Sequence, residues 1–346
     1  MKNVLVTGGA GFIGSHLVDK LVAEGLAVTV IDSLEAQVHK RFPDYLNPGA
    51  RYFFSRVHAP TLNYAELLRD TDTVYYLASK VGPTQSMSDI ADYTDANINS
   101  LGYFLQRVLD HGRKVRRFVL SASMGPYGEG MYHCDRCAMD FYPQGIRKTF
   151  EYRCPKCGGP AKNAALDEST EINNASYYGI SKNVQETMLR LFAEAYGRQL
   201  VSLRYFSVYG PRQAFNNPYA GPIPIWILNA AKGKDLVVYE DGLQTRDFIN
   251  VRDITNLNFR AGGLKMRGPV EIINCGAGGV TRIIEVARLV KKLTKSRSRI
   301  VVTKTIRPGD LRHSLADNSK LKRLMKYTKF ISVPDGLASY IKGLRL

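Results

Sequence analysis

A glycine-rich turn, Thr7-Gly8-Gly9-Ala10-Gly11-Phe12-Ile13-Gly14, joins a short β-branched run at residues 2–7 to a helical pattern at Phe12–Ala23. Glycines let the backbone turn tightly and approach a pyrophosphate, whose charge the free N–H groups at the start of the helix can bind. A glycine triplet alone is weak evidence, but the flanking strand and helix make it specific. The residues expected to contact a dinucleotide here are Gly8, Gly11, Phe12, Ile13 and Gly14.

A carboxylate follows this turn at the spacing that a dinucleotide site requires. The second strand, residues 27–31, leads to Asp32, 18 residues after Gly14. A carboxylate in that position accepts hydrogen bonds from the adenosine ribose. A serine, a leucine and a glutamate come next, and no arginine is there to bind a 2′-phosphate. The sequence therefore predicts NAD rather than NADP.

Strand-like and helical patterns alternate through the first 206 residues. Further strands are expected at residues 73–77, 117–121 and 200–204, and helices at Tyr93–Leu109 and Tyr178–Ala195. Such alternation is typical of an α/β protein with a Rossmann-type, doubly wound parallel sheet. After about Phe206 the segments become shorter and contain more Pro and Gly, which favours a smaller C-terminal lobe for the substrate.

Two pairs of cysteines interrupt this alternation. Cys134 and Cys137 are separated by sixteen residues from Cys154 and Cys157, in a segment with weak helical and strand periodicity. Four thiolates with no open position suit a structural zinc ion. Reduced, unligated thiols and a redox or iron-containing site are the alternatives. Cys275 stands alone and is expected to be a small buried residue.

These patterns predict three parts of the chain. The NAD-binding Rossmann domain comprises residues 1–128 and 164–206, and a zinc-ribbon-like insertion occupies residues 129–163. Residues 207–346 form mainly the substrate-binding lobe, with some segments returning to the Rossmann domain.

Composition limits the class of protein. The chain has 346 residues, 45% of them hydrophobic and 23% charged, as in globular proteins. No apolar run reaches the length of a membrane span and no signal peptide is apparent, so the expected location is the cytoplasm. The net charge is +17, and the segment after residue 280 holds 17 basic and 4 acidic residues. This balance favours phosphates or other anionic partners.

Three side chains form a candidate site for alcohol–carbonyl chemistry. Tyr178 and Lys182 lie four residues apart on one face of a predicted helix, and Ser123 follows an apolar strand. Taking a hydride from a sugar carbon requires removal of the hydroxyl proton, and a phenol with a pKa of about 10 is a poor base at neutral pH. We expect Lys182 and the nicotinamide ring to lower the pKa of Tyr178, while Ser123 holds the substrate oxygen.

Taken together, these motifs resemble a known family. The turn at residues 7–14, Ser121-Ala-Ser123, Tyr178-Gly-Ile-Ser-Lys182, the segment 203–213 and Arg246-Asp-Phe-Ile249 are similar to the extended short-chain dehydrogenase/reductases. The specific likeness is to the nucleotide-sugar epimerase branch that includes UDP-glucose 4-epimerase. The resemblance implies epimerisation of a nucleotide-diphosphate sugar, with C4 the favoured centre, through transient oxidation to a keto-sugar. NAD would be held tightly and the hydride returned to the opposite face.

The resemblance also implies roles for individual residues. Tyr178 is the base, Lys182 binds the nicotinamide ribose and Ser123 contacts the sugar hydroxyl. Residues implied to line the cofactor are Ala78, Ser79 and Asn99. Residues implied to bind the substrate are Ser123, Ser207, Arg246 and Arg307, of which the two arginines would hold the diphosphate. A homodimer is implied through the helix that contains Tyr178 and the one at Tyr93–Leu109.

Departures from the family pattern narrow the chemistry. Dehydratases carry an Asp-Glu pair directly after the serine, where this chain has Met124 and Gly125. Elimination and decarboxylation are therefore disfavoured. One alternative within enzymes is an NAD(P)-dependent nucleotide-sugar reductase or dehydrogenase with exchangeable cofactor. An alternative of another class is a nucleic-acid-binding protein on a retired dehydrogenase scaffold. The near-neutral charge of the insert and the retained side chains disfavour it; these side chains are Ser123, Tyr178 and Lys182.

Overall fold

The central element is a seven-stranded, entirely parallel sheet. The computed structural model describes residues 1–145, 147–215, 217 and 221–344. The strand order is β14-β9-β5-β4-β1-β2-β3, so the chain leaves β1 in one direction for β2 and β3 and returns to its other side at β4. The strands are β1 (Asn3–Thr7), β2 (Ala27–Asp32), β3 (Ala50–Phe54), β4 (Thr73–Tyr76), β5 (Arg117–Ser123), β9 (Gln199–Tyr205) and β14 (Val270–Cys275). Ligands bind at the carboxyl ends of strands beside such a reversal.

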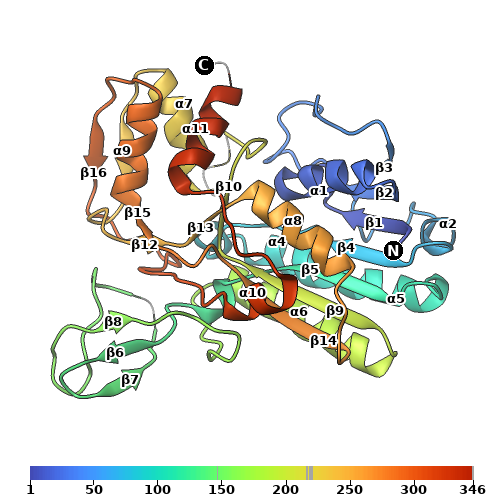
Figure 1. The fold of residues 1–346 in the computed structure, drawn as a ribbon, viewed down its shortest axis with the longest axis horizontal. Coiled ribbons are helices and arrows are strands. Elements are labelled where there is room, and N and C mark those ends of the chain that lie inside the picture. The colour runs from blue at the N-terminus through green and yellow to red at the C-terminus, as the bar shows by residue number, and fades with distance from the viewer. Residues whose placement is uncertain (146, 216, 218–220, 345–346) are drawn as a thin grey trace.

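Helices cover both faces of the sheet, as the sequence predicts for a doubly wound fold (Figure 1). One face packs against α1 (Phe12–Ala23), α8 (Val251–Gly262) and α10 (Ser319–Met325). The other packs against α2 (Tyr64–Leu68), α5 (Ser100–His111) and α6 (Tyr177–Ala195). Because most strand residues are buried from both sides, the strands read as nearly continuous apolar runs.

The helix expected at Tyr93–Leu109 is divided into three segments. An α-helical turn, α4 (Ile90–Thr94), is followed by a π-helical turn, η1 (Asp95–Asn99), and then by α5. A π-helical turn has i→i+5 hydrogen bonds and therefore shifts the residues that face the core. Ahead of it lies α3 (Pro83–Ser86).

The C-terminal lobe has its own apolar core. It is formed by α7 (Pro222–Ala231), α9 (Ile283–Leu293), α11 (Val333–Gly343) and short strand pairs. The pairs are β10 (Ser207–Tyr209) with β13 (Phe248–Asn250), β11 (Leu236–Val238) with β16 (Ile300–Val302), and β12 (Thr245–Arg246) with β15 (Thr281–Arg282). Strand β14 and helices α8 and α10, from the same half of the chain, pack on the main sheet.

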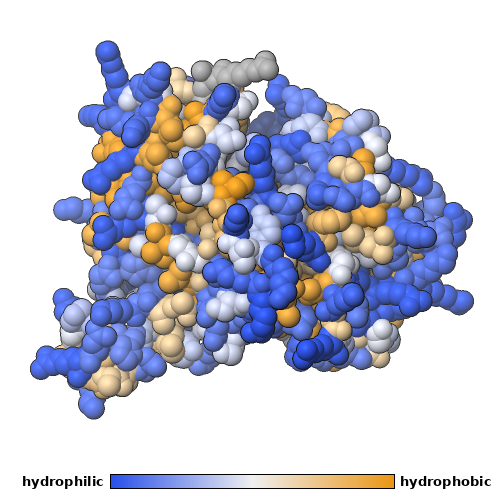
Figure 2. Space-filling view, viewed as in Figure 1, coloured by the Kyte–Doolittle hydropathy of each residue, from blue (hydrophilic) through white to orange (hydrophobic). Residues whose placement is uncertain are grey.

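The cysteine-containing insert is a small antiparallel sheet of order β7-β6-β8. Its strands are β6 (Tyr132–Cys134), β7 (Met139–Phe141) and β8 (Lys162–Asn163), and the Tyr132 ring packs against Phe141 and Tyr152. In Figure 1 the insert projects from one corner of the molecule, below β12 and β15 and on the opposite side from α5. Its surface in Figure 2 is mainly hydrophilic. Within the described residues, every helix is too short or too polar to cross a lipid bilayer.

Candidate active site

The glycine-rich turn lies between β1 and α1, next to β4. Gly8 has φ +72°, and a Cβ atom there would meet the backbone of Ala78 at 2.8 Å. A Cβ at Gly14 would overlap the carbonyl oxygen of Gly8, so the turn and the first helix touch through their backbones. Among the described residues, no side chain caps the N-terminus of α1 at Gly11. The turn therefore has the backbone shape and the exposed helix N-terminus that a pyrophosphate requires.

Asp32 lies at the carboxyl end of β2, beside this turn. Its carboxylate accepts hydrogen bonds from the backbone N–H groups of Ala10 at 2.9 Å and of Leu34 at 2.8 Å. Its burial, with 8% of the residue exposed, keeps it fixed at the edge of the turn. A carboxylate oxygen has two lone pairs, so each oxygen retains one for a ribose hydroxyl.

Ser123 and Tyr178 come together from β5 and α6. Ser176 begins α6, and its hydroxyl accepts a hydrogen bond from the N–H of Gly179. The first turn of the helix carries Tyr178, whose ring lies beside the Ser123 hydroxyl, on either side of Gly125. The backbone N–H of Tyr178 donates to the hydroxyl of Ser86, at 2.9 Å. Serine, phenol and helix start are thus held at the carboxyl end of the sheet, where the sequence places them.

Lys182 lies one helical turn below Tyr178, with 3% of the residue exposed. Its ammonium donates to the backbone carbonyl of Ser121 at 2.9 Å and to the side-chain oxygen of Gln185 at 3.0 Å. Burial lowers the pKa of Lys182 to about 7. Burial raises the pKa of Tyr178, and the neighbouring Ser123 hydroxyl offsets only part of this rise.

This electrostatic balance differs from the expectation that Lys182 lowers the pKa of Tyr178. The ammonium is bonded to Ser121 and Gln185, and loss of hydration shifts the pKa of both Lys182 and Tyr178 in the direction that favours the neutral form. In the protein by itself, the phenol is therefore a weaker acid than in water. Of the two groups expected to lower the pKa of Tyr178, only the positively charged nicotinamide ring is left.

The structure places Asn97, rather than Asn99, beside the expected cofactor segment. Asn99 is exposed and its side chain bonds to Asp95. Asn97 is fully buried and accepts hydrogen bonds from the Ser79 hydroxyl at 3.0 Å and from the backbone N–H of Lys80 at 2.7 Å. The π-helical turn at residues 95–99 causes this difference, because it rotates Asn97 inward. Asn97, and not Asn99, therefore contacts Ser79 in this structure, and the role of Asn99 in lining the cofactor stays a prediction.

Ala78 and Ser79 lie at the carboxyl end of β4, where they contact the two parts of this site. The backbone N–H of Ala78 donates to the Thr7 hydroxyl at 3.2 Å, directly behind the glycine-rich turn. Ser79 contacts Asn97, which in turn donates to the Ser181 hydroxyl of α6 at 2.9 Å. The strand end therefore links the phosphate turn to the helix of Tyr178 and Lys182. Sequence reasoning missed Asn97, and its proximity to the predicted Asn99 was the only signal.

The residues expected to hold substrate phosphates converge on the segment 307–312. Arg246 donates to the backbone carbonyls of Leu311 at 2.6 Å and Arg312 at 3.2 Å. Arg307 forms an ion pair with Asp310 at 2.7 Å. Ser207 starts β10, one strand away from Arg246, and its backbone N–H donates to the carbonyl of Asp247. The two arginines are thus joined through one loop.

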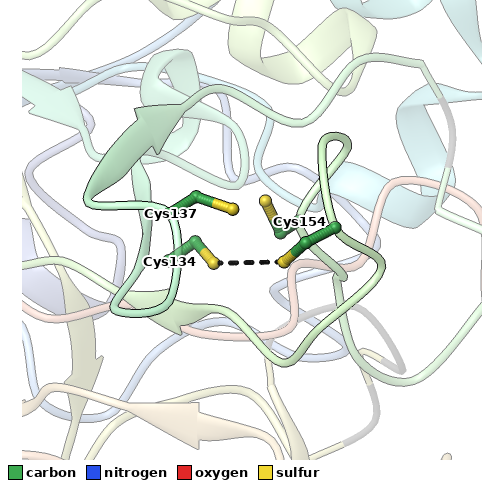
Figure 3. Close-up of side chains that lie close together, drawn as sticks. Cys134, Cys137 and Cys154 are labelled. Carbon is green, nitrogen blue, oxygen red and sulfur yellow. Dashed lines mark hydrogen bonds between the residues drawn. The ribbon is translucent and has the colours of Figure 1, made fainter.

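The four paired cysteines also converge (Figure 3). Their sulfur atoms all lie within 4.8 Å of one another, and those of Cys134 and Cys157 are 3.7 Å apart. Tetrahedral zinc with Zn–S bonds of about 2.3 Å places sulfur atoms about 3.8 Å apart. Cys134 and Cys154 are buried, which shields the cluster from solvent. The donor set and its spacing therefore fit a tetrahedral metal ion, while Cys275 is buried elsewhere in the main core.

Comparison with known proteins gives a family match. Residues 4–276 match the sequence model of the NAD dependent epimerase/dehydratase family. The dTDP-L-rhamnose 4-epimerase of Burkholderia thailandensis is 28% identical over 92% of this chain and 88% of its own. The UDP-N-acetyl-alpha-D-glucosaminuronate decarboxylase of Bacillus cytotoxicus is 30% identical over 99% of this chain and 98% of its own.

Two solved structures share the whole architecture. The UDP-N-acetylglucosamine 4-epimerase of Methanobrevibacter ruminantium superposes with a TM-score of 0.80 at 28% identity, covering 99% of this chain and 98% of that one. The UDP-glucuronic acid 4-epimerase of Bacillus cereus, in complex with UDP-glucuronic acid and NAD, superposes with a TM-score of 0.80 at 26% identity, covering 99% of each chain.

Proposed function

Because the chain belongs to the NAD-dependent epimerase/dehydratase family, we propose that it inverts C4 of a nucleotide-diphosphate sugar with NAD as its cofactor. The observation that carries this proposal is the position of the Ser123 hydroxyl beside the Tyr178 ring, at the strand ends near the glycine-rich turn, with the buried Lys182 one helical turn away. Relatives with 4-epimerase activity in their names, on two nucleotides and several sugars, support the choice of C4.

The roles of the residues follow from their positions. NAD, when bound, would supply the hydride acceptor and donor for inversion of the sugar carbon. Tyr178 takes the hydroxyl proton as the hydride leaves and gives it back when the hydride returns. Ser123 holds the sugar oxygen next to the phenol. Lys182, when protonated, stabilises the phenolate and binds the nicotinamide ribose.

Decarboxylation is the alternative that the relatives raise, since a decarboxylase is among them. Gly125 disfavours it, because a Cβ atom there would lie 3.3 Å from the Ser123 hydroxyl and 3.3 Å from the Tyr178 ring. A carboxylate side chain therefore does not fit between these two groups without displacing one of them. Met124 supplies no acid or base either. We propose epimerisation without elimination or loss of carbon dioxide.

We further propose that the insert binds one structural zinc ion through Cys134, Cys137, Cys154 and Cys157. The four converging thiols support this assignment. The insert has two- and three-residue strands and few buried apolar side chains, so metal binding would supply much of its folding free energy.

A homodimer through α5 and α6 remains a prediction, as does the cytoplasmic location. The helix α6 exposes Tyr177, Ile180 and Leu191 on one face, and α5 beside it exposes Leu109. These apolar side chains support the proposed dimer surface.

The proposal is tested by incubating the purified protein with UDP-, GDP-, dTDP- and CDP-sugars and recording proton NMR spectra of the sugar ring. We expect inversion at C4 for at least one substrate, with no net consumption of NAD and with NAD retained after dialysis. A product lacking a carbon or a water molecule, or an absolute need for added NAD(P)H, would assign the chain to a decarboxylase, dehydratase or reductase instead.

A further inference from the structure

The insert contacts the substrate-binding lobe through a buried network of charged side chains. Arg147 of the insert has 3% of its side chain exposed and forms ion pairs with Glu129 and with Glu240, which precedes β12. Arg312, whose side chain is fully buried, forms ion pairs with Glu240 at 3.0 Å and Asp241 at 2.6 Å. It also pairs with Glu151 of the insert. Breaking one member of such a buried network leaves an uncompensated charge, so these contacts fix the insert to the lobe.

Glu129 links this network to the segment that carries Arg307. Both of its carboxylate oxygens lie 2.9 Å from the backbone N–H of Arg312, which donates to them. Burial raises the pKa of Glu129 to about 6, so the carboxylate is mostly ionised at neutral pH. Arg246 holds the same segment through the carbonyls of Leu311 and Arg312. The segment 307–312 is therefore bound both by Glu129 of the insert and by Arg246.

A cavity of about 10 Å³, which is room for about one water molecule, lies where the insert meets this segment. Glu129, Arg147 and Tyr152 line it from the insert, and Arg307 and Asp310 line it from the other side. Ala175, three residues before Tyr178, completes the wall. The hydroxyl of Tyr152 is buried, and among the described residues it has no hydrogen-bond partner. A buried hydroxyl without a partner is costly unless a ligand or water supplies one.

We propose that the cysteine insert forms a wall of the nucleotide-sugar pocket, in which the Tyr152 hydroxyl bonds to the sugar through one water molecule in this cavity and Glu129 positions the loop of Arg307. This inference rests on the proposed function for its ligand class. It assigns the insert to the substrate pocket rather than to the subunit surface, and the position of the insert away from α5 agrees with that assignment (Figure 1). Tyr152 is a specificity-determining residue and Glu129 a positioning residue.

The test compares direct binding of UDP and of UDP-glucose, UDP-N-acetylglucosamine and UDP-glucuronic acid to the NAD-loaded protein by calorimetry. Tyr152→Phe removes only the hydroxyl, and Tyr142→Phe makes the same change elsewhere in the insert, outside the cavity lining. We expect Tyr152→Phe to weaken binding of the preferred UDP-sugar about fivefold, the loss of one hydrogen bond, while leaving the affinity for UDP unchanged. Tyr142→Phe should change neither affinity.

Glu129→Gln should weaken binding of UDP and of the UDP-sugar alike, by about tenfold, because it acts through the loop of Arg307. Its KM should rise while kcat stays within about twofold, a split that general destabilisation would not produce. Bound metal and the thermal midpoint, recorded for each variant, identify any that is misfolded. Because Tyr152→Phe keeps the ring that packs on Tyr132, it tests the proposal even if Glu129→Gln does not fold.

Equal UDP-sugar affinities in Tyr152→Phe and the wild type, or equal losses in Tyr152→Phe and Tyr142→Phe, would overturn the proposal for the insert while leaving epimerisation intact. Binding of a UDP-sugar without inversion would overturn the proposed function, and the affinities of the variants would still decide the role of the insert. If neither UDP nor any UDP-sugar binds, both proposals fall.

Discussion

Replacing Lys182 by methionine should shift the free energy of unfolding of the nucleotide-free protein more favourably at pH 7 than at pH 9. The Lys182 side chain is buried, and its pKa falls from 10.5 to about 7 because burial removes hydration from the ammonium. At 1.36 kcal/mol per pKa unit, keeping the charge at this site costs about 5 kcal/mol relative to water. Methionine has a similar length and carries no charge, so it removes this cost.

The sign of the pH dependence follows from proton binding. Between pH 7 and pH 10.5 the unfolded chain holds the proton of Lys182 and the folded protein releases it, so the unfolded state binds more protons. Stability of the wild type therefore rises with pH across this window, and the contribution is constant below it. Relative to Lys182→Met, the free energy of unfolding of the wild type should increase by about 2 kcal/mol from pH 7 to pH 9.

Hydrogen bonds set a second, pH-independent difference between the two proteins. Lys182→Met leaves the carbonyl of Ser121 and the amide oxygen of Gln185 without this donor, at a cost of about 1–3 kcal/mol each. That cost is the same at both pH values, so only the change between them reports the ionisation. Urea unfolding followed by circular dichroism at pH 7 and pH 9 measures it, with Lys114→Met as the control at an exposed lysine. An effect of Lys182→Met that does not change with pH would refute the argument that burial neutralises this group.

Three further changes test other parts of the site. Tyr178→Phe should lower kcat by at least about 100-fold while the thermal midpoint and NAD binding stay unchanged, and undiminished turnover would remove Tyr178 from the mechanism. Gly14→Ala should destabilise the protein by about 1–3 kcal/mol and weaken NAD binding, because the added methyl group overlaps the Gly8 carbonyl. The control is Gly102→Ala, where the added methyl group meets only the end of the Met188 side chain, at 3.5 Å. This variant should instead stabilise α5 by about 0.5–1 kcal/mol. If both variants bind NAD with the same affinity, the geometry assigned to the glycine-rich turn is contradicted. Metal analysis should find about one zinc per chain. The variant Cys154→Ser should lose this zinc, and residues 129–163 should then become sensitive to proteolysis. Wild-type protein that contains no metal and still has a protease-resistant insert would refute the zinc assignment.

Local sequence patterns predicted the parts of the site that a single turn or helix holds. The glycine turn, Asp32 and the pair Tyr178 and Lys182 each depend on residues within one strand–turn–helix unit or one helical face. The convergence of the four cysteines could also be predicted from the sequence, because their spacing reflects the geometry of one metal ion. These features could be found because the chemistry fixes the spacing along the chain.

Three features depend on information that spacing along the chain does not carry. Asn97 lies on a π-helical turn between two α-helical segments, where the sequence predicts one continuous helix. The buried network joins Glu129 and Arg147 to Glu240 and Arg312, which are far apart in the sequence. Charged residues are mostly exposed, so nothing in the local sequence marks these four as buried. The pKa of Tyr178 also depends on burial that only the folded protein defines.

The most direct measurement follows the hydrogen at C4 of the sugar. A UDP-sugar carrying deuterium at C4 is incubated in ordinary water with the NAD-loaded protein, and the product is examined by NMR and mass spectrometry. If the hydrogen leaves as a hydride and returns to the opposite face, the product has inverted configuration at C4 and keeps its deuterium. Loss of the deuterium to water, or a product with unchanged configuration at C4, would contradict the account.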